Sequence, residues 1–224
     1  MDKIYKVGIV GCGRIFPMHA CSIQSIPQCK LTAVCDIKPQ RAQMRAEEFS
    51  CCAYTDYKEM IEKEQLDVLH ICTPHYLHPI MAVYALEHGV HVMTEKPMSI
   101  AYADTVAMVE AAHKTGKTLG VIFQNRYNPG SVLAKQAMES GRLGRVLGAK
   151  LNVTWMRTDD YYSQSDWKGT WDKEGGGVLI DQAIHTLDLL RWIMNDPIDF
   201  VDVSMANRMH HVIEVEDVAE GVIG

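Results

Sequence analysis

The chain has 224 residues, of which 47% are hydrophobic and 22% charged, and a formal net charge of −6. That length accommodates two domains with a sizeable core, and the acidic balance gives no basic surface for nucleic acid or anionic lipid. We therefore expect a globular protein without nucleic-acid or membrane partners, and cysteines within its apolar runs favour the reducing cytoplasm.

The stretch from Lys6 to Phe16 is typical of a buried strand that enters a glycine turn and then a helix. Gly11 and Gly13 let the backbone bend sharply and approach a ligand, while Phe16 takes the third glycine position of the dinucleotide-binding pattern. The N–H groups at the start of the helix suit a pyrophosphate. A second apolar run ends in Asp36, 20 residues beyond Phe16, where an acid meets the ribose hydroxyls. The pattern predicts a dinucleotide site, the alternative being a tight turn without a ligand.

Short apolar strands alternate with helical segments through the first half of the chain, as in a parallel sheet covered on both faces. The expected strands span residues 5–10, 31–35, 67–72, 90–94 and 118–123. The expected helices span residues 39–49, 57–64, 79–88 and 103–115. We infer an α/β fold in which a doubly wound Rossmann domain occupies residues 1–122.

The second half has a different pattern, which predicts an α/β domain over residues 123–224 with an open, mainly antiparallel sheet. Polar and apolar residues alternate from Lys150 to Trp155, as in a strand with one solvated face. Further strand-like runs lie near 198–206 and 211–223, and helices are expected over 131–139 and about 178–194. The sequence stops within a strand-like run, so we expect the C-terminal part of this domain to be missing.

In the last expected helix, Asp181, His185 and Asp188 fall at i, i+4 and i+7 and so share one face. Leu187 and Leu190 lie with other apolar residues on the opposite face, which should anchor the helix to its sheet. Three glycines precede the helix and would let its first turn approach a ligand. The Asp/His face is a candidate for a cleft, the alternative being a solvated Asp–His pair.

Lys96 follows the end of an expected strand, as Thr73 and Pro74 do, and ligands of doubly wound sheets bind beyond such ends. A lysine beside a dinucleotide and a carboxylate can hydrogen-bond a sugar hydroxyl while sharing its proton with a base. Without this context, a lysine near a strand end is usually a solvated surface residue.

Together these motifs resemble the Gfo/Idh/MocA (glucose-fructose oxidoreductase / inositol dehydrogenase) family of NAD(P)-dependent oxidoreductases. The resemblance covers nearly the whole chain and rests on Gly11-Cys12-Gly13-Arg14-Ile15, Thr73-Pro74 with His78, Glu95-Lys96-Pro97, Arg126 with Pro129, and Gly175-Gly176-Gly177 followed by Asp181 and His185. Position 75, often Asn in this family, is His75, and the strands that members carry beyond residue 224 are absent. The family implies a Rossmann domain and a substrate-binding α/β domain whose open sheet commonly forms subunit contacts, hence a homo-oligomer.

The resemblance also implies roles for individual residues. The cofactor would contact Gly11, Gly13, Arg14, Ile15, Asp36, Thr73, Pro74, His78, Glu95, Lys96 and Arg126. The substrate would contact Lys96, Tyr162, Trp167, Asp181 and His185. Lys96 would orient the reacting hydroxyl, Asp181 would position substrate and lysine, and His185 would be the general base, because the ordinary pKa of histidine lies nearest working pH.

Asp36 favours NAD over NADP, because a carboxylate placed for ribose hydroxyls repels a 2′-phosphate, although Lys38 and Arg41 lie nearby. We expect no metal, since neither histidine group of the chain has a fourth ligand at zinc-like spacing.

The predicted function is hydride transfer between NAD and a secondary hydroxyl or ketone of a sugar, sugar derivative or cyclitol. Two alternatives stay open at this point. One is a family variant that retains NAD and cleaves glycosides by elimination. The other is a dinucleotide-binding protein without catalytic activity.

Overall fold

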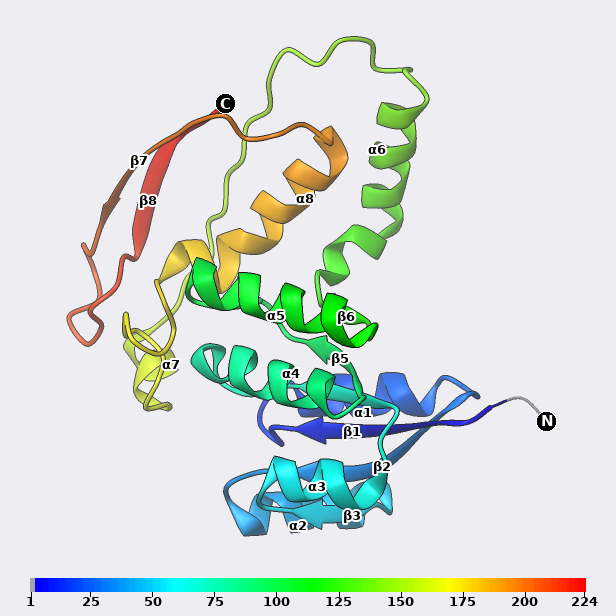
Figure 1. Cartoon of the computed structure of the whole chain (residues 1–224). Helices are drawn as coiled ribbons and strands as arrows, with labels where there is room; N and C mark the ends of the chain where they lie inside the picture. Colours follow the sequence, from blue (N-terminus) through cyan, green and yellow to red (C-terminus); the bar gives the residue numbers. More distant parts are fainter. Residues whose placement is uncertain (1–2) are drawn as a thin grey trace. The chain divides into compact units, whose positions relative to one another are not determined.

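Six parallel strands form one sheet in the first half of the computed structural model, which describes residues 3–224 (Figure 1). The strands are β1 (Tyr5–Val10), β2 (Cys29–Cys35), β3 (Cys52–Tyr54), β4 (Val68–Ile71), β5 (His91–Thr94) and β6 (Leu119–Val121). Their spatial order is β3-β2-β1-β4-β5-β6. The order reverses between β1 and β4, so the carboxyl ends of these two strands form the crevice where doubly wound sheets bind ligands.

Helices cover both faces of this sheet (Figure 1). They are α1 (Phe16–Gln24), α2 (Pro39–Phe49), α3 (Tyr57–Glu64), α4 (His78–Glu87) and α5 (Tyr102–Thr115), with the short 3-10 turn η1 (His75–Leu77) before α4. On one face, Phe16 of α1 is buried with Ile9 of β1. On the other, Met60 of α3 and Leu86 of α4 are buried with Leu69 of β4. Burial of both faces explains why the strands are apolar runs.

The predicted fold class is confirmed, and the elements of this half differ from the prediction mainly at their ends. Asp56 caps α3 by accepting the N–H of Lys58, as a helix N-cap does. Strand β3 was not predicted, because its three residues are exposed or half-buried and carry no apolar pattern. It is placed at the edge of the sheet by its pairing with β2.

The chain divides between Ile122 and Phe123 into two compact units. The helical segments of the second unit are η2 (Gln124–Tyr127), α6 (Pro129–Glu139), α7 (Asp159–Ser163), the π-helical turn η3 (Leu179–Ala183) and α8 (Ile184–Met194). Strands β7 (Val201–Ala206) and β8 (Val218–Ile223) pair antiparallel. A small core of Tyr162, Ile213 and Val215 lies in this unit.

Two expectations for the second unit were wrong. Lys150–Trp155 is not a strand: half-buried Leu151 and Val153 alternate with exposed Asn152, but no strand of the described residues pairs with the segment. Alternation alone does not make a strand, because the ladder needs a partner. Helix α8 packs against α6, and none of its residues is fully buried, so its apolar stripe is not anchored on the sheet as predicted.

Candidate functional site

The glycine turn at the end of β1 lies against the segment that follows β4. Gly11 has a φ of +94°, a conformation that favours glycine, and a Cβ there would lie 2.4 Å from the carbonyl oxygen of Cys72. Its N–H donates to the carbonyl of Cys35, 2.8 Å away. A Cβ on Gly13 would meet no atom within 4 Å. The fold itself requires Gly11, whereas the space at Gly13 is accessible to a ligand.

Helix α1 begins directly after this turn, as predicted. Arg14 and Ile15 are exposed, and the N-cap residue Ile15 has no side-chain oxygen to bind the first N–H groups of the helix. These groups, at the positive end of the helix dipole, can hold an anion. Phe16 is fully buried, and its ring packs edge-on against Phe49 with 5.5 Å between centroids. The side chain that replaces the third glycine therefore points into the core.

Asp36 directly follows β2 and is 7% exposed. Its Oδ2 accepts the N–H of Cys12 at 3.0 Å and lies 3.4 Å from Nη1 of Arg41. Its Oδ1 accepts the N–H of Lys38 at 2.9 Å. The carboxylate thus joins the end of β2 to the glycine turn, a contact that the spacing did not predict.

Thr73, Pro74 and His78 lie in the turn that follows β4 and leads through η1 into α4. The hydroxyl of Thr73 donates to the sulfur of Met81 at 3.6 Å. The His78 ring is fully buried, with Nδ1 2.8 Å from the carbonyl oxygen of Pro97 and Nε2 2.9 Å from that of Thr73. Burial lowers the pKa of His78. This ring faces backbone and links the turn after β4 to the turn after β5.

Glu95, Lys96 and Pro97 form the turn after β5, and the peptide bond before Pro97 is cis. The N–H of Glu95 donates to the carbonyl of Ile71 at 3.0 Å, and the N–H of Lys96 donates to Oε2 of Glu95 at 3.2 Å. Burial raises the pKa of Glu95, but the hydrogen bonds and charges of His19 and Lys96 together outweigh burial, so the pKa is lowered overall. Lys96 is half-buried beside an ionised carboxylate.

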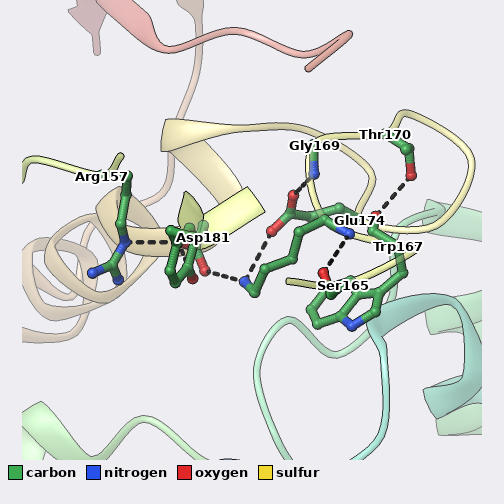
Figure 2. A network of polar contacts seen from close by, with 9 residues as sticks. Arg157, Ser165, Trp167, Gly169, Thr170, Glu174 and Asp181 are labelled. Atoms are coloured by element: carbon green, nitrogen blue, oxygen red, sulfur yellow. Dashed lines mark hydrogen bonds and ion pairs between the residues drawn. The ribbon is translucent and has the colours of Figure 1, made fainter. Parts of the chain in front are cut away.

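In the second unit, Figure 2 shows a polar network that joins Asp181 and Glu174. Nζ of Lys168 lies 3.3 Å from Oε1 of Glu174 and 3.3 Å from Oδ1 of Asp181. Oδ2 of Asp181 accepts the hydroxyl of Tyr161 at 2.9 Å and lies 3.7 Å from Nε of Arg157. Both oxygens of the Asp181 carboxylate are therefore held by groups from α7 and from the segments on either side of it.

The two carboxylates of this network are deeply buried, Glu174 at 0% and Asp181 at 6% exposure. Burial lowers the pKa of Lys168, but the charges of Asp181 and Glu174 outweigh burial and raise it overall. Burial has the opposite effect on the carboxyl of Glu174 and raises its pKa. Oε2 of Glu174 accepts the N–H of Gly169. Lys168 is thus a half-buried ammonium that balances the buried negative charge.

His185 lies near the start of α8, whereas Asp181 belongs to the π-helical turn before it. The ring of His185 lies edge-on to that of Phe123, with 6.3 Å between centroids. Asp188 forms a two-point ion pair with Arg126, in which Nε and Oδ2 are 2.8 Å apart. Asp181 and Asp188 therefore bind different segments of the unit.

Gly177, the last of the three glycines before η3, makes room for another part of the chain. A Cβ on Gly177 would lie 1.8 Å from the carbonyl oxygen of Glu216. That carbonyl accepts the N–H of Val178 at 3.0 Å, and Oε1 of Glu216 accepts the N–H of Leu179 at 3.2 Å. Glu216 thus caps the first turn of the helix.

Two aromatic residues of the loop were predicted to bind substrate. Tyr162 is 7% exposed in the small core and packs edge-on against His210, with 5.2 Å between ring centroids. Burial raises the pKa of Tyr162 to about 12. The Trp167 ring lies under the ammonium of Lys168, with 4.6 Å from Nζ to the ring centroid. Trp167 is therefore in contact with the charged network, whereas Tyr162 belongs to the small core.

Both halves of the chain match family models. Residues 5–123 match the oxidoreductase family with an NAD-binding Rossmann fold, and residues 132–224 match the GFO/IDH/MocA C-terminal domain. The chain belongs to the Gfo/Idh/MocA family. Membership confirms the resemblance drawn from the sequence motifs.

Several Gfo/Idh/MocA relatives have known activities or structures. The WlbA dehydrogenase of Chromobacterium violaceum, solved with NADH and UDP-GlcNAcA, is 35% identical, with a TM-score of 0.95 over 99% of this chain and 64% of that one. The D-glucoside 3-dehydrogenase of Escherichia coli is 31% identical over 86% of this chain and 54% of its own length. The inositol 2-dehydrogenase of Salmonella typhimurium is 29% identical over 95% of this chain and 61% of its own.

The chain thus spans roughly half to three fifths of the length of the curated relatives that it matches.

Within residues 3–224, none of the helices is both long and apolar enough for a membrane span. The same residues contain no group of three or more His, Cys, Asp or Glu side chains arranged to hold a metal ion.

Sequence reasoning did not single out Arg157 or Glu174 of the charged network. Both look like surface charges in a loop without periodicity, and no motif indicates that Glu174 is the more deeply buried. Its place directly before the glycines was the one available signal, since this segment was expected to approach a ligand closely.

Proposed function

We propose that this Gfo/Idh/MocA chain carries the cofactor-binding and substrate-converting parts of a dehydrogenase. It transfers a hydride between NAD and a secondary hydroxyl or ketone of a sugar, sugar derivative or cyclitol. The observation that carries the proposal is the Glu95–Lys96–Pro97 turn at the carboxyl edge of a Rossmann sheet. The named activities of the relatives, a glucoside and an inositol dehydrogenase, support the same reaction class.

The first unit is proposed as the dinucleotide-binding domain, and its residues fit NAD. The open space at Gly13 and the uncapped start of α1 suit a diphosphate, beside Arg14 and Ile15. Asp36 would bind the ribose hydroxyls and disfavour NADP. The further proposed contacts are Gly11, Thr73, Pro74, His78, Glu95, Lys96 and Arg126, with His78 acting through the backbone carbonyls that it faces.

Bound NAD would accept or supply the hydride. Side chains of the protein would remove or supply the proton of the reacting hydroxyl. His185 is proposed as the general base for the reacting hydroxyl, and Lys96 as the residue that orients this hydroxyl and stabilises developing negative charge. Asp181 would position the substrate and the lysine. The contacts of Asp181 with Lys168 and Tyr161 support this role, because they fix the direction of its carboxylate.

The second unit is proposed as the substrate-binding and oligomerisation domain. A nucleotide-activated uronic sugar is the first substrate to test, because the relative solved with UDP-GlcNAcA aligns over 99% of the chain. Trp167 and Tyr162 remain the proposed substrate contacts of the segment before the glycines, together with Lys96, Asp181 and His185.

Exposed Val201 and Val222 on the two-stranded sheet support a homo-oligomer. The cytoplasm remains the proposed compartment, since all seven cysteines are free thiols.

The proposal is tested by following NADH absorbance while the protein is incubated with NAD and a panel of UDP-uronic acids, aldoses, polyols and cyclitols. We expect NADH to form with at least one compound, and only in the presence of the protein. If the folded protein binds NAD but forms no NADH with any member of the panel, and the ketone forms do not consume NADH, the proposal is wrong.

A further inference from the structure

A chain of two histidines and one carboxylate lies beneath the Lys96 turn and has no place in the mechanism so far. His19 comes from α1, His70 from β4, and Glu95 directly follows β5. His19 is 6% exposed, with Nδ1 2.9 Å from Nδ1 of His70 and Nε2 2.9 Å from Oε1 of Glu95. Oε2 of Glu95 in turn accepts the N–H of Lys96.

The proton positions follow from these contacts. Two imidazole nitrogens form a hydrogen bond only if one proton lies between them. When that proton belongs to His70, neutral His19 carries its own proton on Nε2. When it belongs to His19, the contact between Nε2 and Glu95 needs a further proton. Because the lowered pKa of Glu95 keeps this carboxylate ionised, Nε2 of His19 carries that proton and the ring is then an imidazolium. In both arrangements His19 donates to Glu95.

The charges of the three groups agree with this arrangement. Burial lowers the pKa of His70 to about 4, so His70 is neutral at neutral pH. It therefore carries no positive charge that would compete with His19 for the Glu95 carboxylate. The lowered pKa of Glu95 keeps this carboxylate ionised and able to accept from His19 and from the Lys96 backbone at the same time. A half-buried carboxylate with both oxygens bonded has a fixed orientation.

We propose that His19, held by His70, is a positioning residue that orients Glu95 and, through it, the Lys96 turn. His78 holds the other end of this turn by its contact with the carbonyl of Pro97. Lys96 therefore lies between two points fixed by buried imidazoles, one from α1 and one from α4. Because α1 also begins at the glycine turn, His19 connects the dinucleotide turn to the proposed catalytic lysine.

The catalytic consequence rests on the proposed function, whereas the proton arrangement does not. The first experiment therefore uses NMR of isotope-labelled histidine ring nitrogens in the full chain at neutral pH, with each ring assigned by substitution. We expect Nε2 of His19 to be protonated and a single proton to be shared between Nδ1 of His19 and Nδ1 of His70. We expect Glu95→Gln to change the His19 Nε2 signal. An unprotonated Nε2 of His19 overturns the inference.

The second experiment separates positioning from general folding. His19→Leu should lower kcat about tenfold or more while KM for NAD changes less than about threefold, because Lys96 is misplaced while the glycine turn remains. His19→Gln, whose amide can donate to Glu95, should recover part of the loss. The control is His113→Leu on an exposed position of α5. Equal kcat in the wild type, His19→Leu and the control overturns the inference.

The two experiments distinguish failure of this inference from failure of the proposed function. If the wild type forms no NADH with any substrate, the proposed function fails and the NMR result alone decides on His19. If His19→Leu does not fold, the NMR result on the wild type and the activity of His19→Gln decide.

Discussion

Asp36 and Lys168 are the residues whose surroundings could not have been read from the sequence. Asp36 was predicted from its distance to the glycine turn, yet the structure shows that its carboxylate also binds the Cys12 N–H of that turn. The structure places Lys168 between two buried carboxylates, Glu174 and Asp181. Both cases depend on long-range contacts, which leave no periodic pattern in a sequence.

Asp36 is expected to control the choice between the two nicotinamide dinucleotides. Asp36→Ser removes the negative charge that repels a 2′-phosphate and leaves Arg41 and Lys38 to attract it. We predict that KM for NADP falls about tenfold relative to KM for NAD, a change of about 1.4 kcal/mol in relative binding. Measuring both constants in the variant and in Asp104→Ser, an exposed control on α5, checks this prediction. An unchanged ratio would exclude Asp36 from cofactor selection.

Lys168 is expected to matter for stability because of the charges that it balances. Lys168→Met leaves Glu174 and Asp181 buried without their ammonium partner, which should lower the free energy of unfolding by about 3–5 kcal/mol. Adding Glu174→Gln removes one of the unbalanced charges and should restore part of this loss. Urea unfolding of Lys168→Met, Glu174→Gln and the double variant, with Lys150→Met at an exposed position as control, tests this coupling. Strictly additive effects would contradict it.

At the scale of elements, the apolar strands and the capped helices of the first unit were predictable from the sequence, because each is locally consistent with its burial. The second unit was less predictable. The alternation of Lys150–Trp155 has no partner strand in the described chain, and the helix predicted over 178–194 begins as a π-helical turn capped by Glu216. In both cases the local structure depends on contacts with segments that are distant in the sequence.

Gly177 is expected to be indispensable for the start of this helix. Gly177→Ala would place a Cβ 1.8 Å from the carbonyl oxygen of Glu216, so the backbone must move and the cap must break. We predict a loss of about 2 kcal/mol or more in the free energy of unfolding, or failure of the second unit to fold. Gly148→Ala, where a Cβ meets no atom within 4 Å, is the matched control. Thermal unfolding that is equal in both variants would show that the contact is not required.

Asp217 fixes the connection between β7 and β8 by accepting the N–H groups of Arg208, Met209 and His210. Burial raises the pKa of Asp217, but these hydrogen bonds outweigh burial and lower it below 3.8. Its contribution to stability is therefore present above the unfolded pKa and is lost as pH falls through the folded pKa. Asp217→Asn should cost about 1 kcal/mol at neutral pH and progressively less in acid. Denaturant unfolding of the wild type and of Asp217→Asn, measured from neutral pH into acid, tests this prediction. A destabilisation by Asp217→Asn that grows as pH falls would contradict it.

For the whole molecule, the sequence indicated the family, the fold class and the candidate residues, because these depend on short motifs at the ends of strands and on the spacing of residues along one helix. It did not indicate how those residues are supported. Glu95, Lys96 and Pro97 were recognised as a motif, whereas the buried imidazoles of His19 and His78 that hold this turn come from helices far away in the sequence. These contacts form only when the folded strands bring the turns together, so no local sequence pattern predicts them.

The central claim is that Lys96 acts on the reacting hydroxyl during hydride transfer to NAD, and Lys96→Met tests it most directly. The measurement is the rate of NADH formation with the best substrate of the panel, in the wild type, in Lys96→Met and in Lys114→Met, an exposed control on α5. We predict that kcat falls about a hundredfold or more in Lys96→Met and is unchanged in the control, with NAD still bound. A rate in Lys96→Met within a few-fold of the wild type would contradict the account.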